Sequence, residues 1–412
     1  MMGLELKILF KRYRLPLGVL VFIVVIGVVV GYWWMDERRR VKGLLVQGEA
    51  LLAKREYGRA LERLDKYLAE RPGDGRARLL AVRAARQARD FRQAQDYLGQ
   101  CAANYGDAEW IAVEEKLLAV AQGDDRPVSA LRERSKGDDA LALVILEVLV
   151  QRDLDTYQLG AALDGFTRYL AQKPDDLHAL LGRGFVWERY LSFADAAENY
   201  RQAVAAHPDS ERARLKLAET LLIVGTPQEA LTHFVWLADR MPEVPPVRLG
   251  LARCQRRLGE PDKARQILDG LLVEFPNHGE TLWERGELDL EQGKAGQAEP
   301  FLRKAAQARP FDRRVQYSMY RCLLQLGREE EAGKFDKRVK QLDSDLARLA
   351  EIRKGVKTDP NNAALRAEGG LLFLRHGERE EGVRWLQLAL KLDPNCETAQ
   401  RALIAEASRA KN

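Results

Sequence analysis

Apolar residues recur at helical spacing along almost the whole chain, and no segment alternates apolar and polar residues as a half-buried strand would. The pattern therefore predicts an all-α protein. One segment differs, because residues 15–35 form a run of 21 consecutive uncharged residues. As a helix, this run would be about 31 Å long, close to the hydrocarbon thickness of a bilayer. We expect a single transmembrane helix over residues 15–35, after a short basic N-terminal tail at residues 1–14.

The apolar run has the features of a retained anchor. It is longer than the core of a signal peptide, and no small-residue cleavage site follows it. Tyr32, Trp33 and Trp34 stand where interfacial aromatic residues are found. Four basic residues precede the run and four follow it, so the positive-inside rule leaves the orientation open. The short tail favours a periplasmic domain on the inner (cell) membrane, whereas Arg38, Arg39 and Arg40 oppose its translocation.

Prolines mark a repeat in the rest of the chain. Five of them recur at one constant interval, at Pro174, Pro208, Pro242, Pro276 and Pro310. The same phase includes Pro72, and the same interval separates Pro360 from Pro394. A fixed period of about 34 residues is typical of a solenoid, in which each unit buries its apolar face against its neighbours.

Small residues keep the same phase as the prolines. One set lies in the first half of the period, at Gly184, Ala218, Ala252, Gly286 and Gly370, and another in the second half, at Ala196, Ala230, Ala264, Ala298 and Ala332. Glycine stands in the middle of the period, at Gly225, Gly259, Gly293, Gly327 and Gly377. The small residues let two helices approach closely, and the glycine can end the first helix in a left-handed conformation. Each period therefore predicts a pair of helices.

This combination resembles the tetratricopeptide repeat family. The segment Gly184 to Trp187, followed by Ala196, Tyr200, Ala203 and Pro208, has the spacing of the family's packing residues. The resemblance implies a right-handed α-solenoid of about ten helix pairs over residues 36–396, preceded by the transmembrane helix. It implies little about chemistry, because the shared residues are packing residues.

Three segments depart from a regular array. The unit at about residues 109–142 has Val128 in place of the second small residue and is predicted to be a degenerate repeat. Residues 329–357 interrupt the period and predict an extended helix with a stripe at Val339, Leu342, Leu346, Leu349 and Ile352. This stripe packs either on its own chain or on a partner. Residues 397–412 are expected to form a C-terminal capping helix and tail.

The charges exclude one class of function. Of the 412 residues 31% are charged, and the net charge is +5. Residues 1–42 hold eight basic and three acidic side chains, and the remaining residues hold 58 of each sign. A solenoid without net charge lacks the basic excess that neutralises phosphates, so we expect no nucleic-acid partner.

The sequence contains no recognisable catalytic or metal-binding motif. Glycine-rich phosphate loops, GxSxG, HExxH and cysteine pairs are absent, and the five histidines fall singly in different repeats. The four scattered cysteines are expected to be buried small residues, and the many Glu and Asp residues to lie on solvated helix faces. We therefore expect no enzyme, no cofactor, no metal and no small-molecule substrate.

The family resemblance implies a concave groove lined by the first helix of each repeat. Carried over by position, the groove includes Arg76, Arg83 and Arg86 in an early repeat. The predicted partner-binding groove residues are Phe185, Arg189, Arg253, Arg256, Trp283, Glu287, Tyr317 and Arg321. Aromatic side chains beside arginines are typical of binding hot spots. The alternative is that Trp283 and Tyr317 pack between repeats and that Arg253 pairs with Glu287.

These observations favour a non-enzymatic, membrane-anchored scaffold of bacterial type that binds a protein or peptide partner in its groove. Replacing Arg253 and Arg256 by Glu is expected to abolish this binding and to leave the solenoid folded. The alternative is an accessory or regulatory subunit of an envelope biogenesis enzyme complex, of the lipopolysaccharide or cytochrome c maturation type.

Overall fold

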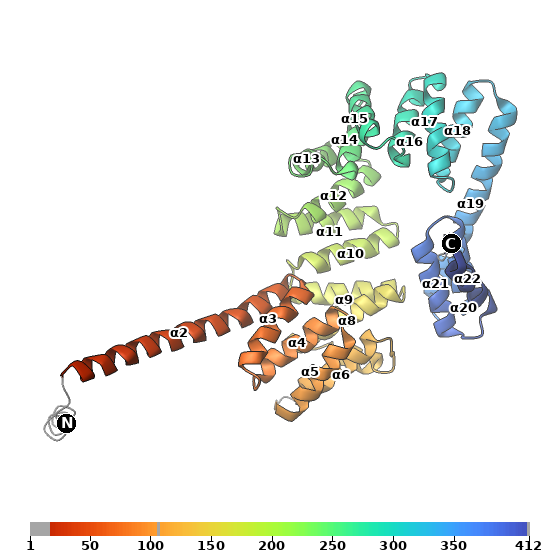
Figure 1. The fold of residues 1–412 in the computed structure, drawn as a ribbon. Helices are drawn as coiled ribbons and strands as arrows, with labels where there is room; N and C mark the ends of the chain where they lie inside the picture. Colours follow the sequence, from red (N-terminus) through yellow and green to blue (C-terminus); the bar gives the residue numbers. More distant parts are fainter. Residues whose placement is uncertain (1–16, 105–107, 410–412) are drawn as a thin grey trace. The chain divides into compact units, whose positions relative to one another are not determined.

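The computed structural model describes residues 17–104 and 108–409. These residues form α-helices and no strand, and the chain divides into two compact units, Met1–Arg152 and Asp153–Asn412 (Figure 1). The all-α helical-repeat prediction is confirmed. The first unit contains α2 (Leu17–Ala53), α3 (Tyr57–Glu70), α4 (Gly75–Gln87), α5 (Phe91–Asn104), α6 (Ala108–Ala121), α7 (Val128–Arg134) and α8 (Ala140–Asp155), whose last turn enters the second unit.

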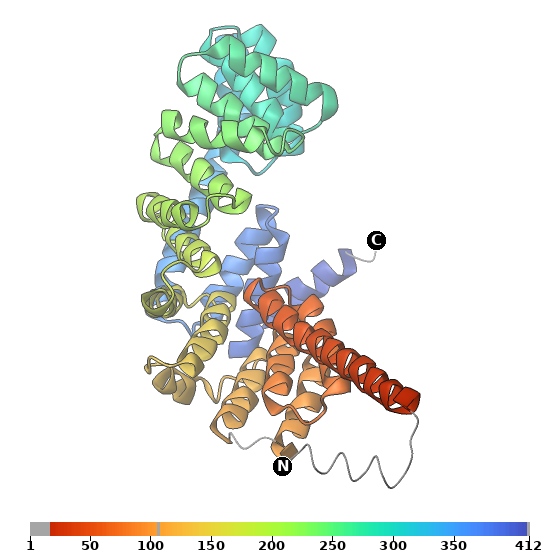
Figure 2. The same ribbon diagram turned by 90° about the vertical axis from the view of Figure 1, so that its left-hand side faces the viewer.

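The second unit continues the series of helix pairs. It contains α9 (Leu159–Gln172), α10 (Leu177–Arg189), α11 (Phe193–Ala206), α12 (Glu211–Val224), α13 (Pro227–Ala238), α14 (Pro245–Arg257), α15 (Pro261–Glu274), α16 (Gly279–Glu291), α17 (Ala295–Ala308), α18 (Arg313–Gln325), α19 (Glu329–Thr358), α20 (Ala363–Arg375), α21 (Arg379–Leu392) and α22 (Glu397–Arg409). From α10 to α18, each helix packs against the next one in the chain (Figure 2).

The first helix of several pairs begins at a polar cap. The side chains of Asp74, Asp176, Ser210 and Asn362 accept the backbone N–H three residues later, at distances from 2.9 to 3.3 Å. Each cap stands two residues after a repeat proline, which cannot continue the preceding helix. The proline and the cap together separate one pair from the next.

The turn inside each pair has a left-handed residue. In six pairs it is glycine, with φ between +72° and +95°, at Gly123, Gly225, Gly259, Gly293, Gly327 and Gly377. In four pairs a larger residue has φ between +58° and +62°, at Arg55, Arg89, Tyr157 and Leu191. The period therefore sets this backbone conformation even where the sequence has no glycine.

Replacing Gly225 by Ala should isolate the cost of this conformation. A Cβ at Gly225 would meet no atom within 4 Å, so the expected loss of about 1 kcal/mol comes from the backbone alone. Gly333, inside α19, also has open space at its Cβ, and its replacement by Ala should raise stability by about 0.5–1 kcal/mol. Urea unfolding followed by circular dichroism compares the two variants. Equal effects would show that the turn does not require glycine.

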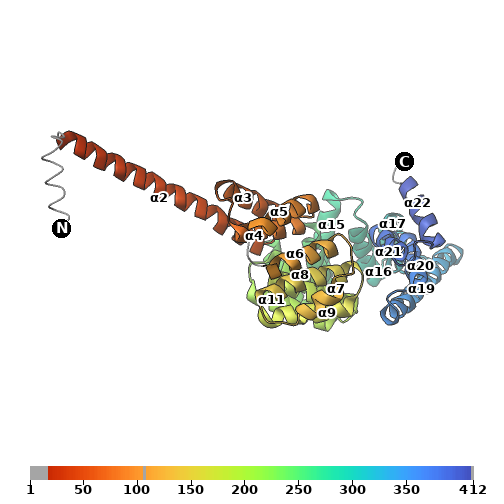
Figure 3. The same ribbon diagram turned by 90° about the horizontal axis from the view of Figure 1, so that it is seen from below.

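The helix that contains the apolar run is longer than the run itself. α2 extends over 37 residues without interruption, and its N-terminal part projects beyond α3 (Figures 1 and 3). Within the described part of the chain, no helix combines the length and the apolarity needed to cross a bilayer. The predicted transmembrane segment is therefore not supported by these residues. The basic tail at residues 1–14, Leu15 and Pro16 lie outside the described residues, as do several side chains of the run.

The irregular segments have simple structures. In the unit at residues 109–142, the second helix is α7, which has only 7 residues. α19 has 30 residues and joins α18 to α20 (Figure 1). Of its apolar stripe, Val339, Leu342, Leu349 and Ile352 are buried, and Leu346 is exposed. Leu349 and Ile352 belong to a cluster with Phe373 and Trp385, so this part of the stripe packs on its own chain.

Candidate functional site: a cavity on the first helices of four repeats

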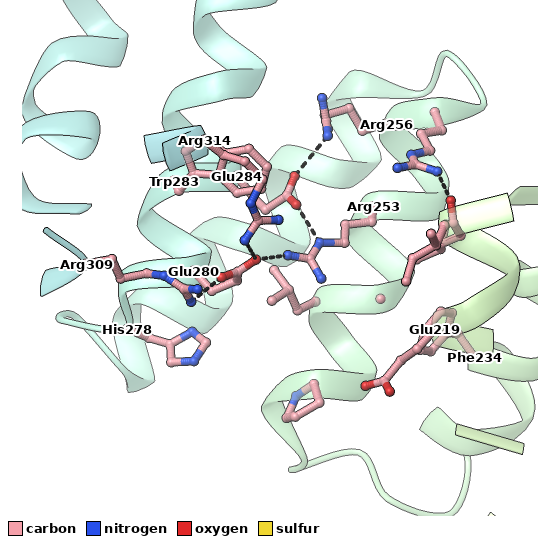
Figure 4. Close-up of a pocket in the computed structure, with 16 residues that line it drawn as sticks. Glu219, Phe234, Arg253, Arg256, His278, Glu280, Trp283, Glu284, Arg309 and Arg314 are labelled. Atoms are coloured by element: carbon pink, nitrogen blue, oxygen red, sulfur yellow. Dashed lines mark hydrogen bonds and ion pairs between the residues drawn. The ribbon is translucent and has the colours of Figure 1, made fainter. Parts of the chain in front are cut away.

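The first helices of successive pairs, α12, α14, α16 and α18, line a cavity of about 510 Å³ in the second unit (Figure 4). Its apolar wall includes Ile223, Phe234, Pro246, Leu249 and Trp283. Its charged groups are five arginines and three glutamates: Arg253, Arg256, Arg257, Arg309, Arg314, Glu219, Glu280 and Glu284. Positive charge is therefore in excess beside apolar surface.

Glu280 and Glu284 hold the arginines in place. Arg253 donates to Glu280, and its Nε lies 2.5 Å from Oε1 of Glu284. Arg256 reaches the other oxygen of Glu284 at 3.1 Å. Arg309 also pairs with Glu280, and Figure 4 shows both carboxylates lying between guanidinium groups from neighbouring helices. Arg256 also pairs with Glu291, and Arg309 and Arg314 pair with Asp312, so carboxylates just outside the lining of the cavity balance much of the arginine charge.

Arg314 joins this network from α18. Its Nη2 lies 3.2 Å from Glu280 and 2.9 Å from Asp312, and its guanidinium lies 4.5 Å from the centre of the Trp283 ring. Burial lowers the pKa of Arg314, but the hydrogen bond to Asp312 and the charge of Glu280 outweigh burial and raise it. Arg314 therefore stays charged while it covers the indole.

Glu219 has a different environment. Burial raises the pKa of its carboxyl group, the nearby Glu188 raises it further, and Lys216 at 3.8 Å lowers it. On the same side of the cavity, Arg257 donates to the backbone carbonyl of Leu222. The Nε atom of Arg256 is buried without a hydrogen-bond partner. The cavity thus contains one unused donor and one glutamate that ionises less readily than usual.

Trp283 is part of the framework of the site. It is only 9% exposed, and its indole N–H donates to the Ser318 hydroxyl at 3.0 Å. Ser318 donates in turn to Glu287, which also pairs with Arg321 at 2.9 Å. Trp283 therefore packs between neighbouring repeats, as the alternative interpretation proposed, and is not an exposed anchor. Arg253 pairs with Glu280 and Glu284 rather than with Glu287.

The predicted groove residues fall into three groups. Arg253, Arg256 and Trp283 line the cavity. Glu287, Tyr317 and Arg321 form an adjoining cluster, in which Tyr317 is 40% exposed and lies between Arg313 and Arg321. Phe185 and Arg189 lie together on α10 and line another hollow with residues 377–381 and Arg384.

The sequence analysis missed several residues of the cavity. Glu219 and Ile223 stand one period before Arg253 and Arg257, so the same spacing could have identified them. Ile223 is 58% exposed, which makes it the most accessible large apolar side chain of this wall. Glu284 was also missed, because acidic residues were expected to be solvated. It is buried, as are Glu114, Glu147 and Asp289, and arginine partners explain how these charges tolerate burial.

The cysteines and the candidate metal ligands also bear on the sequence predictions. Cys101, Cys254 and Cys322 are buried as predicted, whereas Cys396 is partly exposed. Burial raises the pKa of the Cys254 thiol to about 12, which keeps it protonated and unreactive. Across the described helices, no group of three or more His, Cys, Asp or Glu side chains could hold a metal ion.

Models of one family match two of the four helices that form the cavity. Tetratricopeptide repeat models match residues 192–234 and residues 221–283. The chain contains tetratricopeptide repeats. The matched residues include α12 and α14, so the cavity lies on the first helices of these repeats.

Two known proteins are similar to part of this chain. Cellulose synthase operon protein C of Xanthomonas axonopodis pv. citri (strain 306) is 27% identical over 276 residues, which cover 61% of this chain and 18% of that protein. A CTR9 homolog protein of Arabidopsis thaliana is 28% identical over 134 residues, which cover 32% of this chain and 9% of that protein. The chain thus spans less than a fifth of either relative.

Solved structures are also similar to the chain. PilW, described as a widely conserved type IV pilus biogenesis factor, has a TM-score of 0.42 and 20% identity, covering 48% of this chain and 93% of its own. A tetratricopeptide repeat protein of Parabacteroides merdae ATCC 43184 has a TM-score of 0.36 and 15% identity, covering 69% of this chain and 98% of its own.

Proposed function

We propose that the chain is a non-enzymatic scaffold that binds a protein or peptide partner in the cavity formed by α12, α14, α16 and α18. The observation that carries this proposal is the exposed Ile223 beside Arg257, an exposed arginine that donates to a backbone carbonyl rather than to a carboxylate. Exposed apolar surface gives affinity, and the arginine charge selects the partner. The tetratricopeptide repeats support it, because such repeats bind protein or peptide partners.

The chemistry of the cavity defines the partner further. Arg257, whose guanidinium donates to a backbone carbonyl rather than to a carboxylate, favours an acidic ligand. The wall of Ile223, Phe234 and Leu249 favours an aliphatic or aromatic side chain next to the acid. The partner is then a peptide segment with Asp or Glu beside an apolar residue. The buried arginine–glutamate pairs hold the cavity in shape before the peptide arrives, which lowers the entropy cost of binding.

We also propose that the N-terminal segment attaches this scaffold to the inner membrane of a bacterial cell, with the repeats on the periplasmic side. The uncharged run at residues 15–35 supports attachment, and so do the exposed side chains of Phe22, Val28 and Val29 on α2. Tyr32 and Trp33 are exposed just before the basic residues, where an interfacial position would place them.

A second candidate is an accessory subunit of an envelope biogenesis enzyme complex. The similarity over 276 residues to a protein named after a cellulose synthase operon favours it. If the chain is such a subunit, deleting it should lower the activity of an enzyme that purifies with it. If it is a scaffold for other proteins, deleting it should leave that activity unchanged.

Replacing Ile223 by Asp tests the proposed cavity. The variant puts a charge on the apolar wall, next to Glu219 at one side, and should weaken binding of acidic–apolar peptides selected from a displayed library by about 100-fold. The matched control is Val273→Asp, because Val273 is 84% exposed on α15 and lies outside the cavity. Equal affinities of the two variants, or selection of basic peptides, would refute the proposal.

A further inference from the structure

A second cavity lies where the first turn of the second unit meets its C-terminal helices. The Tyr157 ring packs edge-on against Trp385 with ring centres 5.1 Å apart, and Arg366 donates to the Thr156 carbonyl at 3.2 Å. Trp385 is fully buried by these contacts. Beside them, a cavity of about 700 Å³ extends between the start of α9, the end of α10 and the last turns of α19.

The charged residues of this cavity all have the same sign. They are Arg189, Arg353, Lys354 and Lys357, and no Asp or Glu lines it. Arg189 has a distant partner, Glu381 at 4.0 Å, and Lys357 lies 5.2 Å from the centre of the Tyr190 ring. In a chain whose other charged surfaces pair arginine with glutamate, four cations without a carboxylate among them favour an anionic ligand.

Several polar groups of the cavity lack partners. The Tyr157 hydroxyl and Nε of Arg353 are buried and make no hydrogen bond. The first turn of α9, Leu159 to Ala161, also lines the cavity, and the Gln158 side chain does not cap this helix. The Tyr157 hydroxyl and Nε of Arg353 have almost no accessible surface, so a ligand in the cavity does not reach them. A helix N-terminus offers N–H groups to an anion, and the first turn of α9 adds these groups to the four cations that line the cavity.

Tyr157 and Leu191 both line the cavity and occupy the left-handed position inside their helix pairs, as Arg55 and Arg89 do in the first unit. Leu191 is 67% exposed, so its side chain offers apolar surface next to the four cations.

We propose that this cavity binds a phosphate monoester joined to an apolar or aromatic group. The phosphate lies among Arg353, Lys354, Lys357 and the N-terminus of α9, because it offers three acceptor oxygens and up to two negative charges. The apolar group lies against Tyr190, Leu191 and Val356. Bound in this way, the ligand links α9 and α10 to α19 and stabilises the contact between Tyr157 and Trp385.

The test uses 1-naphthyl phosphate as the probe and the full-length chain in isothermal titration calorimetry. We expect one site, with Lys354→Glu/Lys357→Glu weakening the affinity by about tenfold or more, because two attractive charges become repulsive. Both lysines are exposed, and circular dichroism confirms that the variant folds. The matched control is Lys334→Glu/Lys337→Glu, two exposed lysines earlier on α19 and outside the cavity, which should bind as the wild type does.

Two further titrations identify the source of the phosphate. Inorganic phosphate should bind more weakly than 1-naphthyl phosphate, because it leaves the apolar wall uncovered. A water-soluble short-chain phosphatidic acid, titrated in the same way, tests a lipid headgroup: tighter binding than 1-naphthyl phosphate that only Lys354→Glu/Lys357→Glu abolishes assigns the phosphate to a lipid. If neither the naphthyl probe nor the short-chain lipid binds, or if both double variants lose binding equally, the proposal is wrong.

Discussion

Replacing Arg86 by Ala is expected to cost the first unit about 3–5 kcal/mol of stability, because it leaves a buried carboxylate without its partner. Arg86 on α4 donates to Glu114 on α6 at 3.0 and 3.3 Å, and the two side chains are 1% and 2% exposed. Glu114 has no route to solvent in this position. Urea unfolding followed by circular dichroism measures the loss.

The double variant Arg86→Met/Glu114→Leu is the control for this result. It removes both charges and keeps similar side-chain volumes, and replacing a whole buried ion pair in this way is often neutral or stabilising. We expect it to recover most of the stability that Arg86→Ala loses. If Arg86→Ala costs less than about 1 kcal/mol, the pair is hydrated and contributes as little as a surface ion pair.

The double variant Arg253→Glu/Arg256→Glu is expected to destabilise the second unit by about 3–5 kcal/mol. The Glu284 side chain is 3% exposed, and both of its oxygens are held by these two arginines. The variant removes both partners of Glu284 and places two further carboxylates beside it. The ion pairs of Glu284 thus lead us to expect a less stable solenoid, and loss of peptide binding in this variant would also report destabilisation.

Arg257→Glu is the matched control for that double variant. Arg257 lines the same cavity, but it is exposed, and its guanidinium donates to a backbone carbonyl rather than to a carboxylate. Its replacement should change stability by less than about 1 kcal/mol, as for most surface positions. Thermal unfolding of both variants distinguishes arginines that stabilise the fold by pairing with Glu284 from an arginine that only lines the cavity. A double variant as stable as the wild type would show that Glu284 does not depend on Arg253 and Arg256.

The period of the sequence was sufficient to predict the helix pairs and the conformation between them. It placed left-handed residues at Gly225 and Gly259 because glycine occurs there. It did not indicate the same conformation at Tyr157 and Leu191, because those residue types do not favour it. Packing of the two helices imposes this conformation, and residue preference only makes it easier or harder.

The period also placed the cavity residues on the first helices of the repeats, but it could not predict which of them are accessible. Trp283 is buried, and Ser318, about one period later, accepts its N–H. Arg86 and Glu114 are also nearly one period apart and pair across neighbouring repeats. Whether two such side chains contact each other depends on their length and conformation, and the repeat spacing does not specify these.

The contact between Tyr157 and Trp385 lay entirely beyond sequence reasoning. The two residues belong to distant repeats, and a repeat pattern describes only contacts between neighbours. α19 is the irregular element beside this contact, and its apolar residues Ile352 and Val356 belong to the same cluster as Tyr157. The extra length of α19 was visible in the sequence, but the contact that its C-terminal end makes was not.

The most direct test of the groove is photocrosslinking in the cell from position 223. Ile223 is more suitable than Trp283, because it is 58% exposed whereas Trp283 is 9% exposed. A photoreactive residue at position 223 should capture one partner, crosslinked within a segment that has Asp or Glu beside an apolar residue, and the same residue at position 273 should not capture it. Capture of the same partner from both positions, or a crosslinked segment without acidic residues, would contradict the account.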